Sequence, residues 1–365
     1  MKLLTVVGAR PQFVKAAVLS RVIKTHPNIE EVLVHTGQHY DHNMSGVFFE
    51  ELKIPKPKYT LGISGMSHGA MIGSMIMEIE KVLVIEKPTY VVVYGDTNST
   101  LAAAISAKKL DIPVIHIEAG VRNFDEMMPE ESNRYLVDRL STLNFCCTEL
   151  GVENLRAEGF FSGNIMSKVF NFGDLMLDAA LHYEQFAVPK NDVLRGFNCI
   201  ENNYAVCTVH RASNTDSYEK LKEIIGALNC INKDTKIVLL AHPRTAAMLI
   251  NYGIKAEFKI FEPVSYLEII PLIKNAKLVI TDSGGLIREA FFFAKPSLLL
   301  LDNPLWPELV DTGCCENVAP VKDKIIDASM RIARTDFDFS SKVYGSGNAG
   351  ELILDAIVQH DYPIV

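Results

Sequence analysis

Carboxylate side chains follow the apolar runs in the first half of the chain. Asp96 follows the run Tyr90–Tyr94 after Gly95, Glu118 ends the run Val114–Glu118, and Glu130 lies in a loop a little further on. Carboxylates that lie together raise each other's proton affinity, so an acid and a base can coexist near neutral pH. The set therefore predicts a proton-transfer site, although Asp96 taken alone has an ordinary alternative as a helix N-cap.

Two other segments suit an anionic ligand. Gly8-Ala9-Arg10-Pro11 follows the first apolar run and leads into a helix that carries Lys15, and Ser283-Gly284-Gly285 opens a later helix that carries Glu289. Helix N-termini bind phosphates through exposed N–H groups, and Glu289 is placed to accept hydrogen bonds from a ribose. The alternative is a tight turn with a solvated arginine in the first case and a flexible turn in the second. Further polar residues follow the other apolar runs, namely Gln38, His39, His210, Arg211, His242 and Arg244.

The elements that must position these residues alternate between short apolar strands and helical stretches. Strands that are apolar throughout are typical of parallel sheets buried on both faces. A polar stretch over 186–199, expected to be irregular, separates two such series, which predicts two doubly wound, Rossmann-like α/β domains over residues 1–185 and 186–345. A helix over 346–365 is expected to return to the first domain. Because ligands bind beyond the carboxyl ends of such strands, we expect the site in a cleft between the domains. The expected strands are 2–7, 31–35, 90–94, 114–118, 144–147, 204–209, 236–241, 258–261, 278–281 and 297–301, and the expected helices are 11–24, 67–86, 98–110, 217–229, 244–252, 265–274 and 286–293.

Composition excludes several classes of protein. Of 365 residues, 48% are hydrophobic, so a large core is available and general disorder is excluded. The formal charge is −8, from 36 basic and 44 acidic residues, and no basic run suggests a nucleic-acid partner. No apolar stretch reaches the roughly 18 residues of a membrane span, and the start of the chain lacks the features of a signal peptide, which predicts a cytoplasmic protein. The seven cysteines have neither C-x-x-C nor metal-finger spacing, so we expect buried free thiols and no metal site.

The order of these motifs resembles the non-hydrolysing UDP-N-acetylglucosamine 2-epimerases, which share the two-domain GT-B architecture. The segments that carry the resemblance run nearly from end to end: Gly8-Ala9-Arg10-Pro11, His35-Thr36-Gly37-Gln38-His39, Gly95-Asp96-Thr97, Glu118-Ala119-Gly120-Val121-Arg122, Pro129-Glu130-Glu131-Ser132-Asn133-Arg134, Thr208-Val209-His210-Arg211-Ala212, His242-Pro243-Arg244-Thr245, Glu262-Pro263-Val264-Ser265-Tyr266 and Thr281-Asp282-Ser283-Gly284-Gly285.

The resemblance implies a cytoplasmic isomerase that epimerises a UDP-2-acetamido sugar at C2 for surface polysaccharide synthesis. UDP leaves to give a glycal and then adds back, with no NAD, no metal and no other cofactor, in an enzyme that is usually a homodimer. The resemblance makes Asp96, Glu118 and Glu130 the acid/base set and His210 a further catalytic or leaving-group residue. It assigns UDP and substrate binding to Arg10, Lys15, Gln38, His39, Arg134, Arg211, His242, Arg244, Tyr266, Ser283, Gly284, Gly285 and Glu289. Gln38, His39, Arg134 and Arg211 belong to the sugar side or to an adjoining regulatory UDP-sugar site.

Several positions depart from the family pattern. Ile287 stands where Gln is usual, Leu301 where Arg is usual, and Ser213 where Glu is usual. Gln12 replaces a usual Glu, and the segment 61–70 resembles members that act on UDP-2,3-diacetamido-2,3-dideoxyglucuronate. An amide in place of that carboxylate would remove repulsion of a sugar carboxylate, so this branch is the expected one. The alternatives are a GT-B glycosyltransferase that uses a UDP-sugar, a hydrolysing 2-epimerase, and a UDP-sugar sensor without activity.

Overall fold

The structure is a computed structural model that describes residues 1–38, 46–332 and 334–360. The chain divides into two compact units. The first unit comprises Met1–Leu181 together with Lys342–Val365, and the second comprises His182–Ser341. Each unit contains one wholly parallel sheet, which confirms the predicted pair of doubly wound α/β domains.

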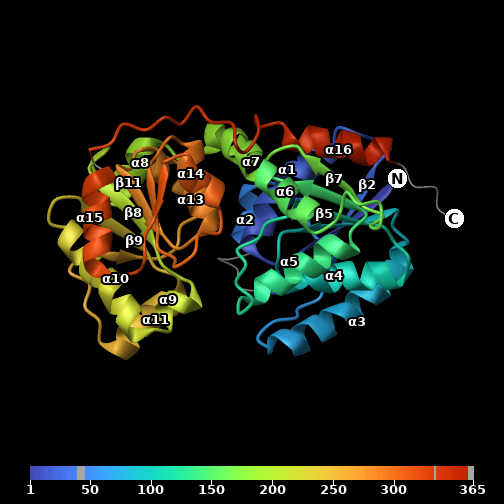
Figure 1. Cartoon of the computed structure of the whole chain (residues 1–365), viewed down its shortest axis with the longest axis horizontal. Helices are drawn as coiled ribbons and strands as arrows, with labels where there is room; N and C mark the ends of the chain where they lie inside the picture. Colours follow the sequence, from blue (N-terminus) through green and yellow to red (C-terminus); the bar gives the residue numbers. More distant parts are fainter. Residues whose placement is uncertain (39–45, 333, 361–365) are drawn as a thin grey trace. The chain divides into compact units, whose positions relative to one another are not determined.

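The first unit is built on a seven-stranded sheet in the order β3-β2-β1-β4-β5-β6-β7. Helices lie on both faces of this sheet, with α1 and α16 together on one face and α3, α4 and α5 on the other (Figure 1). The strands are β1 (Lys2–Val7), β2 (Glu30–His35), β3 (Tyr59–Thr60), β4 (Tyr90–Tyr94), β5 (Val114–Ala119), β6 (Leu143–Cys146) and β7 (Lys168–Asn171). The helices are α1 (Arg10–Ile23), α2 (Gly46–Glu51), α3 (His68–Glu86), α4 (Asn98–Lys109), α5 (Pro129–Leu140), α6 (Glu149–Ala157) and α16 (Ala349–Gln359), and α7 (Leu175–Tyr183) leads into the second unit.

The second unit is built on a six-stranded sheet in the order β10-β9-β8-β11-β12-β13. Its strands are β8 (Tyr204–Thr208), β9 (Lys236–Leu240), β10 (Ile260–Phe261), β11 (Leu278–Thr281), β12 (Ser297–Leu299) and β13 (Cys315–Asn317). Its helices are the short 3-10 turn η2 (Glu184–Phe186), α8 (Lys190–Gly196), α9 (Ala212–Thr215), α10 (Tyr218–Ile231), α11 (Pro243–Tyr252), α12 (Tyr266–Lys274), α13 (Gly284–Phe292), α14 (Pro307–Asp311) and α15 (Lys322–Ile332).

The strands form where the chain is apolar on both faces. All five residues of β4 are fully buried, and β-branched valine fills its centre. The helices begin at residues that cap them, since the Thr97 hydroxyl accepts from the backbone of Thr100 at the start of α4. Asp96 is therefore not the N-cap of this helix, which removes the ordinary alternative for that carboxylate.

Two sequence-based expectations are wrong. The stretch over 186–199 is not irregular, because α8 occupies its centre and begins after Pro189, which cannot sit in a helix interior but suits a helix start. Glu130 does not lie in a loop, because Pro129 opens α5 and places Glu130 in its first turn. A proline followed by two acidic residues is a typical helix start, since the missing N–H and the negative charges both suit that end.

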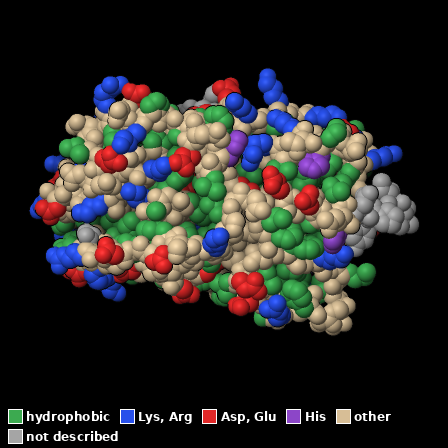
Figure 2. Space-filling model, turned by 90° about the horizontal axis from the view of Figure 1, so that it is seen from above, with side chains coloured by type: hydrophobic (Ala, Val, Ile, Leu, Met, Phe, Trp, Pro, Cys, Tyr) green, Lys and Arg blue, Asp and Glu red, His purple; other side chains and the backbone are tan. Residues whose placement is uncertain are grey.

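The surface is mixed in charge where Figure 2 shows it, with basic and acidic side chains interspersed over the visible face. No described helix combines the length and the hydropathy that crossing a bilayer would demand. All seven cysteines are free thiols, and five of them are buried, in agreement with the prediction of unpaired core cysteines.

Candidate functional site

The strand order identifies where each sheet can bind a ligand. In the first unit the order reverses between β1 and β4, so the segments that follow these strands, Gly8–Arg10 and Gly95–Asp96, flank the reversal. In the second unit the order reverses between β8 and β11, which are followed by His210 and Asp282. Doubly wound sheets bind ligands at this point, because the two diverging loops leave a crevice there.

Asp96 is held by a single arginine on α5. Arg134 donates to one oxygen of Asp96, Oδ2, from Nε at 2.9 Å and from a terminal nitrogen at 2.6 Å. Asn133 fixes the backbone of the same residue by donating to the Asp96 carbonyl at 2.7 Å. Within the described chain no donor reaches the other carboxylate oxygen, and the side chain is 27% exposed. Asp96 therefore presents one oxygen to a ligand while the other is anchored.

Glu118 lies in a strained part of β5. Its φ is +71°, in the left-handed region, and the pairing of β5 with β6 shifts register between Ile117 and Ala119. Such a bulge re-aims a side chain that would otherwise follow the strand, and strain of this kind gathers at functional sites. The Glu118 carboxylate makes an ion pair with the Nζ of Lys15, whose side chain is 2% exposed. A Cβ on Gly95 would lie 3.3 Å from Glu118 Oε1, so the carboxylate packs over the turn that precedes Asp96.

Glu130 is the least constrained of the three expected carboxylates. It is partly exposed in the first turn of α5, and no described residue makes an ion pair or hydrogen bond with it. Its neighbour Glu131 is buried and pairs with Arg134, the same arginine that holds Asp96. Arg134 thus links Asp96 to Glu131. Glu130 has no such contact with a described residue and is available to a ligand.

The remaining first-unit candidates lie at the ends of β1 and β2. Arg10 is the first residue of α1, and its guanidinium stacks over the Phe48 ring with 4.8 Å to the centroid. Gln38 is committed to Ser99, from which its Oε1 accepts hydrogen bonds at 2.8 Å and 3.2 Å. His39 lies outside the described residues.

In the second unit, His210 is oriented by Asp282. The imidazole Nδ1 lies 3.0 Å from Asp282 Oδ1, and the half-exposed ring follows β8 while the fully buried carboxylate follows β11. The same carboxylate accepts from the backbone N–H groups of His210 and Arg211 and from the Asn214 amide. Burial by itself raises the pKa of Asp282, but these hydrogen bonds and the charge of His210 outweigh it and lower the pKa below its ordinary value. Asp282 is therefore a carboxylate that fixes the ring orientation of His210.

Of the other candidates in the second unit, His242 and Arg211 lie close to His210 or its partner Asp282. Arg244 and Tyr266 have their contacts elsewhere. The ring of His242 caps α11 and lies 6.4 Å from the ring of His210. Arg211 donates from Nε to the Asp282 carbonyl at 2.8 Å. Arg244 is exposed and makes an ion pair with Asp216. Tyr266 is buried, 1% exposed, in the protein interior at the start of α12.

The N-terminus of α13 is open toward solvent at one residue. Ser283 caps the helix by accepting from the backbone of Leu286 at 3.3 Å. Gly285 is partly exposed, and a Cβ there would meet only the Ser283 hydroxyl, at 3.8 Å. Gly284 is closed instead, since a Cβ would lie 2.9 Å from the Trp306 indole nitrogen. Glu289 is buried one turn further along the helix, 8% exposed. An anion would approach this helix end at Gly285.

One group of side chains has the composition of a metal site. The ligand atoms of Glu118, Cys147 and Asp174 lie within 4.8 Å of one another. The ammonium of Lys15 is already ion-paired with Glu118, so a positive charge stands where a cation would have to bind. The residues present therefore suit a carboxylate–ammonium pair better than a metal ion.

The chain matches the family model described as UDP-N-acetylglucosamine 2-epimerase over residues 21–358. This chain belongs to that family. It is 44% identical over 360 residues to the UDP-2,3-diacetamido-2,3-dideoxy-D-glucuronate 2-epimerase of Pseudomonas aeruginosa, covering 98% of this chain and 100% of that protein. It is 40% identical over 372 residues to the UDP-N-acetylglucosamine 2-epimerase of Methanocaldococcus jannaschii, covering 99% and 100%.

Solved structures of UDP-N-acetylglucosamine 2-epimerases share the fold. The M. jannaschii enzyme in complex with UDP-GlcNAc and UDP superposes with a TM-score of 0.90 at 40% identity, covering 98% of this chain and 100% of that one. The Neisseria meningitidis enzyme bound to UDP-GlcNAc gives a TM-score of 0.87 at 28% identity, covering 99% and 100%. These findings confirm the resemblance, the fold class and membership of an epimerase family.

The departures from the epimerase pattern fall in the protein interior, with one exception. Ile287 is fully buried and Leu301 is 8% exposed, whereas Ser213 is exposed on α9. Beside Ile287, the buried guanidinium of Arg288 stacks on the Trp306 ring at 4.1 Å. Apolar and stacking contacts therefore occupy the wall beside the α13 N-terminus in this family member.

Gln12 does not face a ligand, contrary to the interpretation of the usual Glu as a charge near the sugar. Its Oε1 accepts from the backbone N–H groups of Gly8 and Ala9 at 2.8 and 3.0 Å, and its Nε2 donates to the Tyr94 carbonyl at 2.8 Å. A carboxylate cannot donate to that carbonyl, so the amide is needed to join the turn after β1 to the turn after β4. The side chain is 2% exposed and its role is structural.

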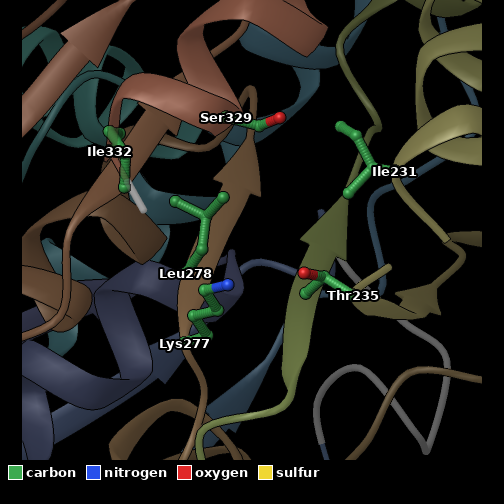
Figure 3. Close-up of a pocket in the computed structure, with 6 residues that line it drawn as sticks. All are labelled: Ile231, Thr235, Lys277, Leu278, Ser329 and Ile332. Carbon is green, nitrogen blue, oxygen red and sulfur yellow. The ribbon is translucent and has the colours of Figure 1, made fainter. Parts of the chain in front are cut away.

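A small cavity in the second unit is unrelated to this site. Its volume is about 30 Å³, enough for roughly one water molecule, and it is lined by residues at the N-terminal ends of β9 and β11 and on α15 (Figure 3). His210 and Asp282 follow the opposite, C-terminal ends of β8 and β11. The cavity is thus at the wrong edge of the sheet for the ligand of a doubly wound domain.

Sequence reasoning missed residues that act through others. Asp282, Glu131 and Asn133 stood inside quoted motifs but were given no role, although Asp282 directly follows β11 as Asp96 nearly follows β4. His116 and Asp138 gave no signal, because His116 is a polar residue within an apolar strand and Asp138 lies in the last turn of α5, a helix that was not predicted.

Proposed function

We propose that this epimerase-family chain interconverts a UDP-2-acetamido sugar and its C2 epimer without hydrolysing it. The proposal is carried by two sets of groups, proton-transfer groups at the strand-order reversal of the first sheet and diphosphate-binding groups at the reversal of the second. The first unit offers carboxylates at Asp96 and Glu118, each anchored by one cation. The second unit offers the oriented His210 and an open helix end at Gly285. Proton transfer and diphosphate binding are the two functions that such an epimerisation needs.

The proposed reaction breaks and remakes two bonds. A carboxylate takes the C2 proton while the C1–O bond cleaves, so the C–H electron pair forms the C1–C2 double bond and UDP leaves with the C–O pair. A proton is then delivered to C2 on the opposite face, and an oxygen of the UDP β-phosphate attacks C1. The net change is an isomerisation, which is redox-neutral and consumes no nicotinamide. Two faces of C2 need two proton carriers, and carboxylates near neutral pH supply them.

The roles are those that the family resemblance implies, and the anchoring of Asp96, Glu118 and His210 supports three of them. Asp96, Glu118 and Glu130 form the acid/base set, and His210, fixed by Asp282, supports the departing diphosphate. The N-terminus of α13 and Arg10 at the N-terminus of α1 stabilise negative charge on UDP.

The deciding experiment incubates the protein with a UDP-sugar in deuterated water and no acceptor. We expect a second UDP-sugar with inverted C2, and one deuterium at C2 of both epimers. A glycosyltransferase would leave the UDP-sugar unchanged without an acceptor, a hydrolysing epimerase would release free sugar and UDP, and a sensor would bind without exchange. Each of these outcomes would replace the proposed function.

For the substrate, we propose a UDP-sugar with a C6 carboxylate. The support is the 44% identity to the P. aeruginosa diacetamido-glucuronate epimerase over its whole length. Measurement of kcat/KM for UDP-GlcNAc and for UDP-2,3-diacetamido-2,3-dideoxyglucuronate tests it. We expect the uronate to be preferred, and a much higher kcat/KM for UDP-GlcNAc would contradict the assignment.

We also propose that the chain forms a homodimer through α3. This helix exposes Met77, Val84 and Ile85, whose side chains are 60%, 56% and 67% exposed. Val84 and Ile85 follow Met77 by seven and eight residues, so the three lie on one face of the helix. A second copy related by a twofold axis would pair this apolar face with itself. Light scattering should give about twice the 40.6 kDa chain mass, and Met77→Glu with Val84→Glu should halve it because like charges would face each other across the axis. A monomer in the unmodified protein would refute this interface.

Finally, we propose the cytoplasm as the place of action, supplying nucleotide sugars for surface polysaccharides. The free and mostly buried cysteines suit a reducing compartment. Fractionation of cells that carry the tagged chain should find it with cytoplasmic markers.

A further inference from the structure

A histidine in the interior of the first unit faces two hydrogen-bond acceptors. His116 lies on β5 and is 0% exposed. Its Nδ1 is 2.7 Å from Asp138 Oδ1 on α5, and its Nε2 is 2.7 Å from the carbonyl oxygen of Gly95, the residue that precedes Asp96. Both distances are those of short hydrogen bonds.

The identity of the partners determines where hydrogens must be. A backbone carbonyl only accepts, so the Nε2 that faces Gly95 has to donate. Asp138 Oδ2 accepts from the Arg122 guanidinium at 2.6 Å and from the backbone N–H of Gly120 at 3.2 Å, and both contacts favour the ionised carboxylate. A carboxylate also only accepts, so Nδ1 has to donate as well. A neutral imidazole has one N–H and would place a lone pair against one of these oxygens at 2.7 Å.

The charges around the ring balance when both nitrogens carry a hydrogen. Arg122 pairs with Asp138 Oδ2 at 2.6 Å and with Glu158 at 2.8 Å. Two cations, His116 and Arg122, then face two anions, Asp138 and Glu158. Buried charges are tolerated when they are paired in this way, whereas a neutral His116 would leave the group with an excess negative charge.

His116 and Asp138 together bind the two turns that carry the proposed proton carriers Asp96 and Glu118. His116 fixes the Gly95 carbonyl, and the next residue is Asp96. Asp138 Oδ2 accepts from the backbone N–H of Gly120 at 3.2 Å, two residues after the strained Glu118. We infer that His116, as a doubly protonated imidazolium bound to Asp138, is the positioning residue that sets Asp96 and Glu118 relative to one another. The inference rests on the proposed function for its catalytic consequence, and on this hydrogen-bond geometry for the state of the ring.

The state of the ring is tested on the unmodified full chain. Histidine labelled with ¹⁵N, with His116 assigned through its backbone, should show both ring nitrogens bonded to hydrogen at neutral pH. A ring nitrogen of His116 without a hydrogen would overturn the inference. This measurement does not depend on activity, so it stands or fails separately from the epimerase proposal.

The positioning role is tested by His116→Gln and the matched His35→Gln. His35 is also buried in the first unit, but it lies on β2 and its ring stacks on Phe13 at 5.4 Å. For His116→Gln we expect kcat to fall about 10- to 100-fold because the carboxylates are displaced, with KM and the Kd for UDP within about twofold. His35→Gln should lower the melting temperature while keeping kcat. Equal kcat in both variants, or an equal loss of UDP binding and kcat in His116→Gln, would overturn the positioning role.

If the unmodified protein exchanges no deuterium at C2, the proposed function fails while the ring assignment is decided by the spectrum alone.

Discussion

Arg134 donates two hydrogen bonds to a single carboxylate oxygen of Asp96, and the second oxygen of Asp96 accepts none from the described residues. A guanidinium that binds both oxygens of a carboxylate satisfies it completely. Here Nε and one terminal nitrogen of Arg134 both donate to the same Asp96 oxygen, because the other terminal nitrogen pairs with Glu131 on the same helix. The arrangement holds Asp96 rigidly by one oxygen, and the other oxygen, which has no donor within the described residues, can take part in proton transfer.

Isosteric replacement of the three carboxylates should therefore remove turnover and preserve the fold. We expect Asp96→Asn, Glu118→Gln and Glu130→Gln each to lower kcat by about 10²- to 10⁴-fold, because an amide cannot take up the C2 proton. Initial rates and melting curves measure the two effects. Glu126→Gln, a change at an exposed position in the loop before α5, is the matched control and should leave the rate unchanged. If any two of the three variants keep near-normal rates, the acid/base assignment is wrong.

The dependence of His210 on Asp282 leads to a second prediction. Asp282→Asn replaces one accepting oxygen by an NH₂ group that points at backbone and side-chain donors. We expect a loss of about 1–3 kcal/mol in the free energy of unfolding and a fall in kcat, because the ring of His210 is no longer fixed. Combined with His210→Ala, the change should add little further loss of kcat, since both act on one group. Asp302→Asn removes an exposed ion pair with Lys220 and serves as the control. Fully additive losses would show that Asp282 does not act through His210.

The N-terminus of α13, which we assign to the diphosphate, can be tested by one substitution. Ser283 is a poor probe because its hydroxyl caps α13, so its removal costs stability whatever it binds. Gly285→Ala is better, since the new methyl group meets only the Ser283 hydroxyl and alanine favours the helix. We expect the melting temperature to be maintained or raised, and UDP binding by calorimetry to weaken about 10- to 100-fold as phosphate loses its approach to the backbone. Gly226→Ala within α10 is the control for the helix effect. Unchanged UDP affinity in Gly285→Ala would move the diphosphate elsewhere.

Much of this site was predictable because it depends on strand ends. Parallel strands carry their following residues to one edge, so apolar runs locate Asp96, Glu118, His210 and Ser283 without knowledge of the strand order. Residues of this kind are local signals, readable from the few positions around them.

The partners of these residues were not predictable in the same way. Asp138 meets His116 across 22 residues, and Asp282 meets His210 across 72, so neither pair has a local pattern. The left-handed φ of Glu118 is also invisible in a sequence that places Glu, and not Gly, at that position. Gln12 was misread for a related reason, since an amide that satisfies three backbone groups and an amide that faces a ligand look alike in sequence.

The last prediction concerns acid stability, which depends on a carboxylate far from the proposed chemistry. Glu86, at the end of α3, accepts from Lys58 at 2.7 Å, from the Tyr59 hydroxyl at 2.6 Å and from Lys2 at 3.1 Å. These partners lower the pKa of Glu86 from 4.5 to about 2. A pKa that is lower in the folded state stabilises the fold above pH 4.5, and this stabilisation is lost as pH falls toward 2. Urea unfolding of the unmodified protein and Glu86→Gln across this range should give a difference in unfolding free energy that is constant above about pH 5 and shrinks on acidification. Glu30→Gln, which removes a longer and exposed contact with Lys2, should show little such change. A difference between Glu86→Gln and the unmodified protein that stays flat down to pH 2 would mean that the Glu86 contacts do not control acid unfolding, because only a titrating carboxylate can make the two curves converge.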